Sequence, residues 1–396
     1  MSASHRLPLF LPDNITMQTF FVALFLFLFV FFSYIHVTAQ WKTSDDLELY
    51  ESDYVSPSQV QDITAVKQPV LFYLLHSTGP NQVGPKGKKT VRDFCAKFQL
   101  RSMEKYDNVD VRVKSALDYF SSDSVEWVHL PLRSAHQLLA SDTNAKYVSE
   151  TNQEFMEETG LKGLAAYHLD SMLRPPLAVL SKYDLVFGSP QTTTPLRYHT
   201  NHQLFLLVCS GKVRVKMCPP KYRKVLDVVE DYDYYEFWSP LRIWSQDPHT
   251  LDKRDKEMLD RIKLLEFEVT EGHVLFVPKY WWYSLRFSGD TNTTICSAAY
   301  DTPASIASNA KPLAIHFMQR AQTKTVVTPV KQNSPIETTS EPTEPVVTPG
   351  FKTGFEMDTV EAINKQAETK PMQSAPLSEK KLPTEIVTNS GVYHMD

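Results

Sequence analysis

The feature that most constrains the fold is a series of short strand-like runs through the middle of the chain. The runs are rich in Val, Leu, Ile and aromatic residues and are bounded by polar turns, as strands are. Runs that we expect to be strands are 70–75, 109–113, 125–129, 183–187, 203–209, 212–217, 264–269, 273–277, 281–287 and 294–299. This succession predicts a mainly β domain with flanking helices (α+β), built as a double-sheet jelly roll and not as alternating β-α-β units.

Helical patterns are fewer than strand patterns and lie mainly early and late in this region. They cover 89–98, 134–140, 153–159 and 306–320, and the charged stretch 252–263 is expected to be a helix or an ordered insertion. The chain has 396 residues, of which 42% are hydrophobic. That length is ample for one domain with a large core together with additional segments.

Charge and cysteine content argue against a nucleic acid partner and a structural zinc site. The formal net charge is -5, so the chain lacks the excess of basic residues that is typical of nucleic-acid-binding proteins. We therefore expect no nucleic acid partner. The four cysteines, Cys95, Cys209, Cys218 and Cys296, form no CxxC pair, so a structural zinc site is not indicated. Their spacing does not distinguish two disulfides from four free thiols.

Two segments place chemistry-bearing residues at a defined spacing. The first is Thr194-Pro195-Leu196-Arg197-Tyr198-His199, which leads through a strand to Ser210-Gly211, a second strand and Pro219-Pro220. The second is Glu271-Gly272-His273-Val274-Leu275-Phe276-Val277-Pro278, which is followed closely by Trp281-Trp282-Tyr283.

Order, spacing and composition of these segments resemble the cupin-like, JmjC-type branch of the Fe(II)/2-oxoglutarate oxygenases. That family shows a TPLHxD-type strand, a hairpin with SG-K that ends in Pro-Pro, a GDVLFIP strand and then W-W-H. The resemblance covers roughly 110–320 and implies a cupin fold. It also implies an iron site of two His and one carboxylate on one face, with open positions for oxygen and cosubstrate.

The positions that match the iron ligands carry other residues in this chain. Arg197 takes the place of the first His, His199 that of the carboxylate and Tyr283 that of the distant His. An arginine is always cationic and has no lone pair to offer a metal, and a tyrosine coordinates only as a phenolate. We therefore expect a degenerate member of the family, with no bound metal.

The position that would hold the far carboxylate of 2-oxoglutarate is also changed. In the family an inward lysine stands two residues after the hairpin glycine, and here that residue is Val213. Side chains alternate along a strand, so Val213, Val215 and Met217 share one face and the basic residues between them lie on the other. Two interpretations of Arg197 stay open: it takes the carboxylate of an anionic ligand, or it pairs with a nearby Asp or Glu inside the core.

A long apolar run near the N-terminus predicts a membrane segment. Apolar residues are unbroken from Phe20 to Phe32, and no charged residue occurs between Asp13 and Lys42. This uncharged segment is just long enough for a helix to cross a bilayer. We favour an uncleaved signal-anchor, although Ala39 before Gln40 also suits cleavage of a signal peptide. Both interpretations put the main domain in the lumen or outside the cell, and cleavage would make the protein secreted.

Composition divides the chain into five parts. They are a short N-terminal segment (1–16), the membrane helix or signal peptide (17–38), a polar linker (39–65), the cupin-like domain (66–322) and a Thr/Pro/Glu-rich tail expected to be disordered (323–396). The sequon at Asn292 would be open to glycosylation outside the cytosol, or is a chance occurrence in a polar loop.

The leading hypothesis is a single-pass membrane protein whose domain is a non-catalytic pseudo-oxygenase acting in binding or scaffolding, with an unidentified protein partner and without a cofactor. The first alternative is an active hydroxylase that uses Fe(II) and 2-oxoglutarate through unusual ligands. The second is a structural surface or envelope glycoprotein. Fold alone does not decide among them.

Overall fold

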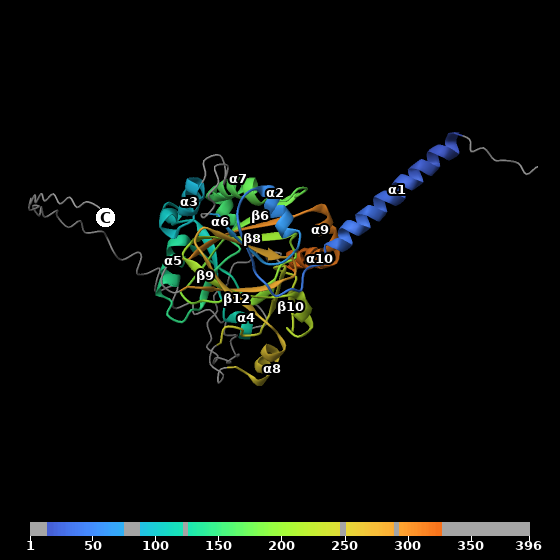
Figure 1. Cartoon of the computed structure of the whole chain (residues 1–396). Coiled ribbons are helices and arrows are strands. Elements are labelled where there is room, and N and C mark those ends of the chain that lie inside the picture. Colours follow the sequence, from blue (N-terminus) through green and yellow to red (C-terminus); the bar gives the residue numbers. More distant parts are fainter. Residues whose placement is uncertain (1–13, 75–87, 122–125, 246–250, 289–292, 327–396) are drawn as a thin grey trace, which may run out of the picture. The chain divides into compact units, whose positions relative to one another are not determined.

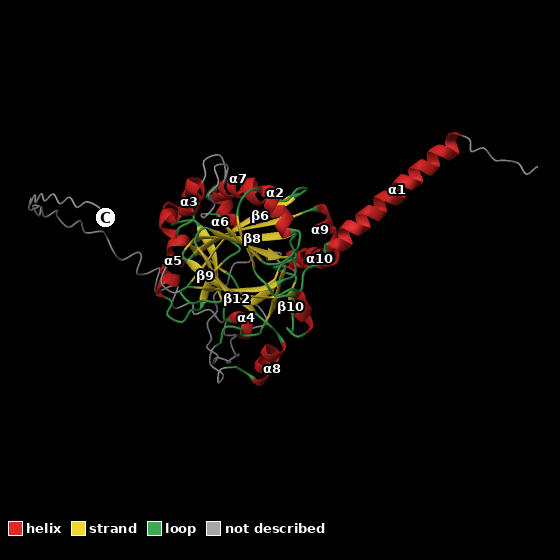
Figure 2. Cartoon of the chain, viewed as in Figure 1, coloured by secondary structure: helices red, strands yellow, loops and turns green. Residues whose placement is uncertain are grey.

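The structure is a computed structural model, and it describes residues 14–74, 88–121, 126–245, 251–288 and 293–326. Within these residues two sheets form the body of the domain (Figure 2). The nine-stranded sheet has the order β1 (Tyr50–Asp53), β2 (Val70–Tyr73), β13 (His273–Pro278), β8 (Gln203–Ser210), β15 (Thr294–Asp301), β6 (Leu180–Gly188), β5 (Tyr147–Ser149), β3 (Asp110–Ser115), β4 (Val128–Pro131). The six-stranded sheet has the order β10 (Val229–Asp231), β11 (Glu236–Ser239), β7 (Leu196–Tyr198), β14 (Trp282–Phe287), β9 (Lys212–Cys218), β12 (Leu265–Thr270).

Helices flank the sheets (Figure 1). Contacts place α3 against β8, α5 against β3, β4 and β5, and both α6 and α7 against β6, so these helices pack on the nine-stranded sheet. The helices are α1 (Asn14–Ala39), α2 (Pro57–Thr64), α3 (Lys88–Lys97), α4 (Asp118–Ser121), α5 (Leu132–Ser141), α6 (Gln153–Glu158), α7 (Leu161–Leu173), α8 (Lys253–Arg261), α9 (Pro303–Ser308) and α10 (Ala310–Val326), with 3-10 turns η1 (Leu100–Tyr106) and η2 (Pro220–Lys224).

The two sheets share one apolar core. Leu206 of β8 and Val277 of β13 belong to the same buried cluster as Val215 of β9 and Leu285 of β14, so the inner faces of the sheets pack against each other. The hairpin between β8 and β9 turns at Gly211, whose φ of 72° lies in the left-handed region that glycine adopts at little cost.

Most of the predicted elements are present, and the β-rich architecture with flanking helices agrees with the prediction. Each of the ten predicted strand runs overlaps an observed strand. The run 306–320 is divided by Asn309 into the end of α9 and the start of α10. Helix α10 reaches Val326, so residues 323–326 of the segment predicted to be disordered are helical, and the rest of that segment lies outside the described residues.

The segment expected to be a linker, 39–65, belongs to the domain instead. It contains β1, which pairs in parallel with β2, and α2. Leu47 and Leu49 pack against the shared core, and the Trp281 indole donates to the Ser44 carbonyl (3.1 Å). The prediction was wrong because it used the composition of the whole segment. Composition counts the acidic residues that face solvent together with the apolar residues that face the core.

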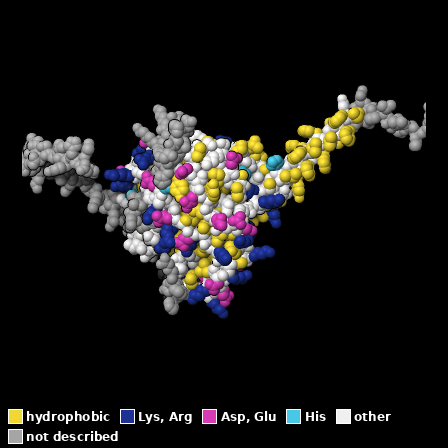
Figure 3. Space-filling model, in the orientation of Figure 1, with side chains coloured by type: hydrophobic (Ala, Val, Ile, Leu, Met, Phe, Trp, Pro, Cys, Tyr) yellow, Lys and Arg dark blue, Asp and Glu magenta, His cyan; other side chains and the backbone are white. Residues whose placement is uncertain are grey.

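Helix α1 is the one described helix long and apolar enough to cross a membrane by length and composition, over Met17–Ala39. Apolar side chains cover it on the side that Figure 3 shows. A signal sequence near the N-terminus meets the same criterion. The four cysteines are all buried and free of disulfides.

Candidate functional site

The structure brings the three substituted ligand positions together inside the domain. Arg197 lies on β7 and His199 directly follows it, so their side chains share one face of the strand. Tyr283 on β14 is the register partner of Arg197. The Arg197 guanidinium carbon lies 5.5 Å from the Tyr283 ring centre, and the His199 and Tyr283 ring centres are 6.4 Å apart.

Arg197 is held by a carboxylate. Its Nη1 donates to Glu150 Oε1 (2.7 Å) and its Nη2 to Glu150 Oε2 (2.5 Å), which is the two-pronged geometry of strong guanidinium–carboxylate pairs. Glu150 follows β5 and is buried. Of the two interpretations of Arg197, the structure thus shows the ion pair within the core.

Glu150 also serves a second cation. The Lys114 ammonium, fully buried on β3, lies 2.6 Å from Glu150 Oε1 and 3.6 Å from Glu236 Oε2. Tyr119 donates its hydroxyl to the same Glu236 oxygen (2.8 Å). Two cations and two carboxylates therefore balance in one cluster, which we call the charge cluster (Lys114, Glu150, Arg197 and Glu236). It ties β3 and the end of β5 to β7 and β11, across the two sheets.

The electrostatics keep Glu150 and Arg197 ionised and Tyr283 neutral. Burial alone would raise the pKa of Glu150, but the Arg197 and Lys114 cations hold that pKa well below its usual range. Burial likewise opposes the charge of Arg197, and Glu150 more than offsets it by raising the pKa of the guanidinium. Burial raises the pKa of Tyr283, so its phenol stays protonated at neutral pH and is not a phenolate ligand.

His199 retains one nitrogen with metal-binding capacity. Its Nε2 lies 2.9 Å from the Val277 carbonyl oxygen, and since a carbonyl only accepts, Nε2 carries the proton and donates. Nδ1 is then a buried acceptor with no partner among the described residues. Burial lowers the pKa of His199 to about 4, so the ring is neutral at physiological pH.

Val213, which the resemblance matches to the cosubstrate lysine, packs in the apolar core. Val213 is 2% exposed and, with Val215 and Met217, belongs to the shared core. The basic residues of β9 point to the other side, as alternation predicts: Lys212 pairs with Glu268 (3.3 Å), and Arg214 pairs with Glu266.

The donor set does not fit an iron centre. Arg197 offers no lone pair, Tyr283 is protonated and His199 offers one nitrogen. Among the described residues, no group of three or more His, Cys, Asp or Glu is arranged to hold a metal ion. Asn292, the proposed glycosylation position, lies outside the described residues.

Sequence reasoning missed Lys114, Glu150 and Glu236, which complete the cluster. Lys114 follows Val111-Arg112-Val113, and the alternation of side chains along this strand predicts that Lys114 faces solvent. Glu150 is 47 residues from Arg197 in the chain. The sequence did contain one signal for such a partner. Arg197 is a cation at a position expected to face the interior, and a buried arginine requires an acceptor.

Comparison with known protein families identifies the family of the domain. The family model of the cupin-like domain matches residues 57–304. The chain belongs to the cupin-like domain family. The match begins inside the segment expected to be a linker, at α2, in agreement with the fold of this cupin-like protein. Comparison with curated proteins found no match.

Proposed function

We propose that this cupin-like protein is a membrane-tethered, non-catalytic pseudo-oxygenase whose domain acts in binding or scaffolding. The observation that carries the proposal is the two-pronged ion pair of Arg197 with Glu150. It puts a permanent cation, already neutralised by protein, where a JmjC-type enzyme would need a metal-binding lone pair.

Two further observations support the proposal, one on catalysis and one on the tether. The side chain of Val213 occupies the cosubstrate position within the apolar core, so the far carboxylate of 2-oxoglutarate would have no cation to meet there. Helix α1, if it crosses the bilayer, would hold the domain at a membrane surface, where a non-catalytic domain can organise partners.

The test is metal content and 2-oxoglutarate binding of the purified full chain in detergent, under anaerobic conditions with added Fe²⁺. We expect neither stoichiometric iron nor saturable 2-oxoglutarate binding. The triple variant Arg197→His, His199→Asp and Tyr283→His restores the family's donor types and indicates whether the frame still accepts iron. Stoichiometric iron in the unaltered chain would refute the proposal.

One observation favours an active oxygenase as the second candidate. His199 Nδ1 is buried and without a partner among the described residues, so it could serve as one ligand of a metal completed by groups other than Arg197 and Tyr283. This candidate predicts succinate release that depends on iron and 2-oxoglutarate and is lost in His199→Gln. Absence of succinate from the iron-loaded chain would exclude it.

A further inference from the structure

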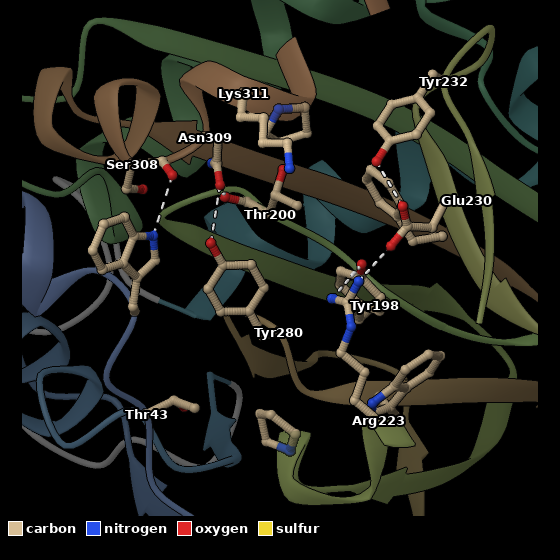
Figure 4. A pocket seen from close by; sticks show the side chains of 15 residues that line it. Thr43, Tyr198, Thr200, Arg223, Glu230, Tyr232, Tyr280, Ser308, Asn309 and Lys311 are labelled. Atoms are coloured by element: carbon tan, nitrogen blue, oxygen red, sulfur yellow. Dashed lines mark hydrogen bonds and ion pairs between the residues drawn. The ribbon is translucent and has the colours of Figure 1, made fainter. Parts of the chain in front are cut away.

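A pocket of about 460 Å³ lies on the opposite face of β7 and β14 from the charge cluster. Tyr198 and Trp282, which neighbour Arg197 and Tyr283 in sequence and pair with each other in register, line it because successive side chains point to opposite faces. The rest of the lining is aromatic and polar (Figure 4). The lining residues used below are Trp41, Tyr198, Arg223, Tyr280, Ser308 and Lys311.

One wall of the pocket is the chain that directly follows α1. Trp41 stands two residues beyond Ala39, the last residue of α1, and its indole donates to the Ser308 carbonyl (3.2 Å). The Lys67 ammonium donates to the carbonyls of Ala39 (2.6 Å) and Lys42 (2.8 Å). These bonds connect the end of α1 to the domain beside the pocket. If α1 spans the bilayer, Trp41 lies at the level of the lipid headgroups, where tryptophan is enriched.

The charges at the pocket leave one cation uncompensated. Arg223 pairs with Glu230 (2.5 Å) and donates to the Tyr198 hydroxyl (2.8 Å), so this pair is neutral overall. Lys311 is exposed, and no carboxylate in the described part of the chain pairs with it. Behind the wall, Lys279 Nζ donates to the hydroxyl of Ser308 (2.8 Å), and because burial lowers the pKa of Lys279 to about 7, this amine is only partly charged at neutral pH.

The aromatic lining supplies carbon surface beside these cations. Trp41 is 54% exposed, and Tyr280 is fixed by its hydroxyl, which donates to Asn309 Oδ1 (3.0 Å). A ligand that combines one phosphate with a small carbon skeleton matches this lining better than a cation, which Lys311 would repel.

We propose that this pocket binds the phosphate-bearing headgroup of an anionic membrane lipid, with Lys311 and Arg223 at the phosphate and with Trp41 and Tyr280 against the glycerol. The inference rests on the membrane tether in the proposed function, because the tether is what brings lipid headgroups to Trp41. Occupancy would make the pocket a second, lipid-dependent contact between domain and bilayer.

The test titrates the full chain, in a neutral detergent, with soluble dihexanoyl phosphatidylglycerol, dihexanoyl phosphatidylcholine and inorganic phosphate, by calorimetry. We expect phosphatidylglycerol to bind at least tenfold more tightly than the other two. Lys311→Ala should weaken that binding about tenfold, which is the loss of about 1.4 kcal/mol. Lys253→Ala is the matched control, since the Lys253 side chain is 92% exposed on α8, outside the pocket lining.

Each other outcome would overturn the proposal. Equal binding of phosphatidylcholine means that the pocket does not recognise a net anion, and equal binding of inorganic phosphate means that the lipid skeleton is not recognised. An equal loss in Lys253→Ala means diffuse surface attraction, and no binding means no site. Because the titration needs no bilayer, failure of the tether is detected separately, as release of the chain from membranes at alkaline pH.

Discussion

Arg197 and Glu150 form a buried ion pair in which each partner depends on the other. A buried ion pair seldom adds much stability compared with apolar packing, but loss of one partner leaves the other charge without compensation. Here the Glu150 carboxylate serves both Arg197 and Lys114, so a single side chain compensates two buried cations. The charge cluster is therefore expected to be sensitive to mutation.

The first prediction concerns Glu150→Gln. The variant keeps the size of the side chain and removes its charge, which leaves Arg197 and Lys114 facing only Glu236. We expect the free energy of unfolding to fall by about 3 kcal/mol, measured by urea unfolding of the full chain in detergent with tryptophan fluorescence. Glu154→Gln is the control: the Glu154 side chain is 80% exposed and pairs with Arg112, so its loss should cost under about 1 kcal/mol. Equal effects of the two variants would contradict the role of the cluster.

The second prediction concerns the pH dependence contributed by His199. Its pKa in the folded chain is lowered to about 4, against about 6.5 when unfolded. Between these values the unfolded chain binds a proton that the folded chain does not, so this contribution to stability is complete above pH 6.5 and is lost as the pH falls toward 4.

The measurement is the difference in unfolding free energy between the unaltered chain and His199→Gln, followed from pH 7 to pH 4. We expect the difference to shift against the unaltered chain by at most about 3 kcal/mol over this interval. His202, whose pKa burial also lowers to about 4, is present in both proteins and cancels. A difference that stays constant with pH would show that His199 titrates normally in the folded chain.

At the scale of elements, the sequence predicted what depends on local pattern and missed what depends on distant partners. The long strands β6, β8, β9 and β15 were predicted because their apolar residues recur along the strand or run unbroken. Several of the strands that were missed, such as β5 and β10 with three residues each, are too short for any periodicity, and they exist because a neighbouring strand pairs with them. The candidate site was predicted only in part for the same reason, that distant partners leave no local pattern. Motif spacing located Arg197, His199 and Tyr283, whereas no local pattern connects them with Glu150.

The third prediction tests the segment before β1 as part of the core. Leu47 and Leu49 alternate with exposed residues and pack against the shared core. The double variant Leu47→Ala and Leu49→Ala should lower the free energy of unfolding by about 2 kcal/mol, less than for fully buried leucines because both are only partly buried. The measurement is again urea unfolding of the full chain.

The control for this segment removes apolar groups that are exposed. Val55 and Val66 are 48% and 60% exposed, so Val55→Ala together with Val66→Ala should change the unfolding free energy by less than about 0.5 kcal/mol. A double leucine variant as stable as this control would mean that the segment is a linker after all.

For the whole molecule, the connection between α1 and the domain decides how the chain would be held at a membrane. Three successive residues at the end of α1 and just after it contact the domain: the Ala39 carbonyl accepts from Lys67, the Gln40 side chain bonds to His202 (2.9 Å) and Trp41 bonds to Ser308. A flexible tether would leave these groups to water. Their contacts instead favour a domain that stays close to the end of α1.

The fourth prediction is that α1 is kept as an anchor. Full-length protein expressed in eukaryotic cells should remain in the membrane pellet after extraction at alkaline pH, because transfer of some 20 apolar residues into lipid is not reversed by loss of surface charge interactions. Intact mass should include the N-terminal residues, and a variant lacking 17–38 should move to the supernatant. A mature protein that begins at Gln40 and leaves the membrane would identify α1 as a cleaved signal peptide, and both the tether and the source of lipid for the pocket would then be lost together.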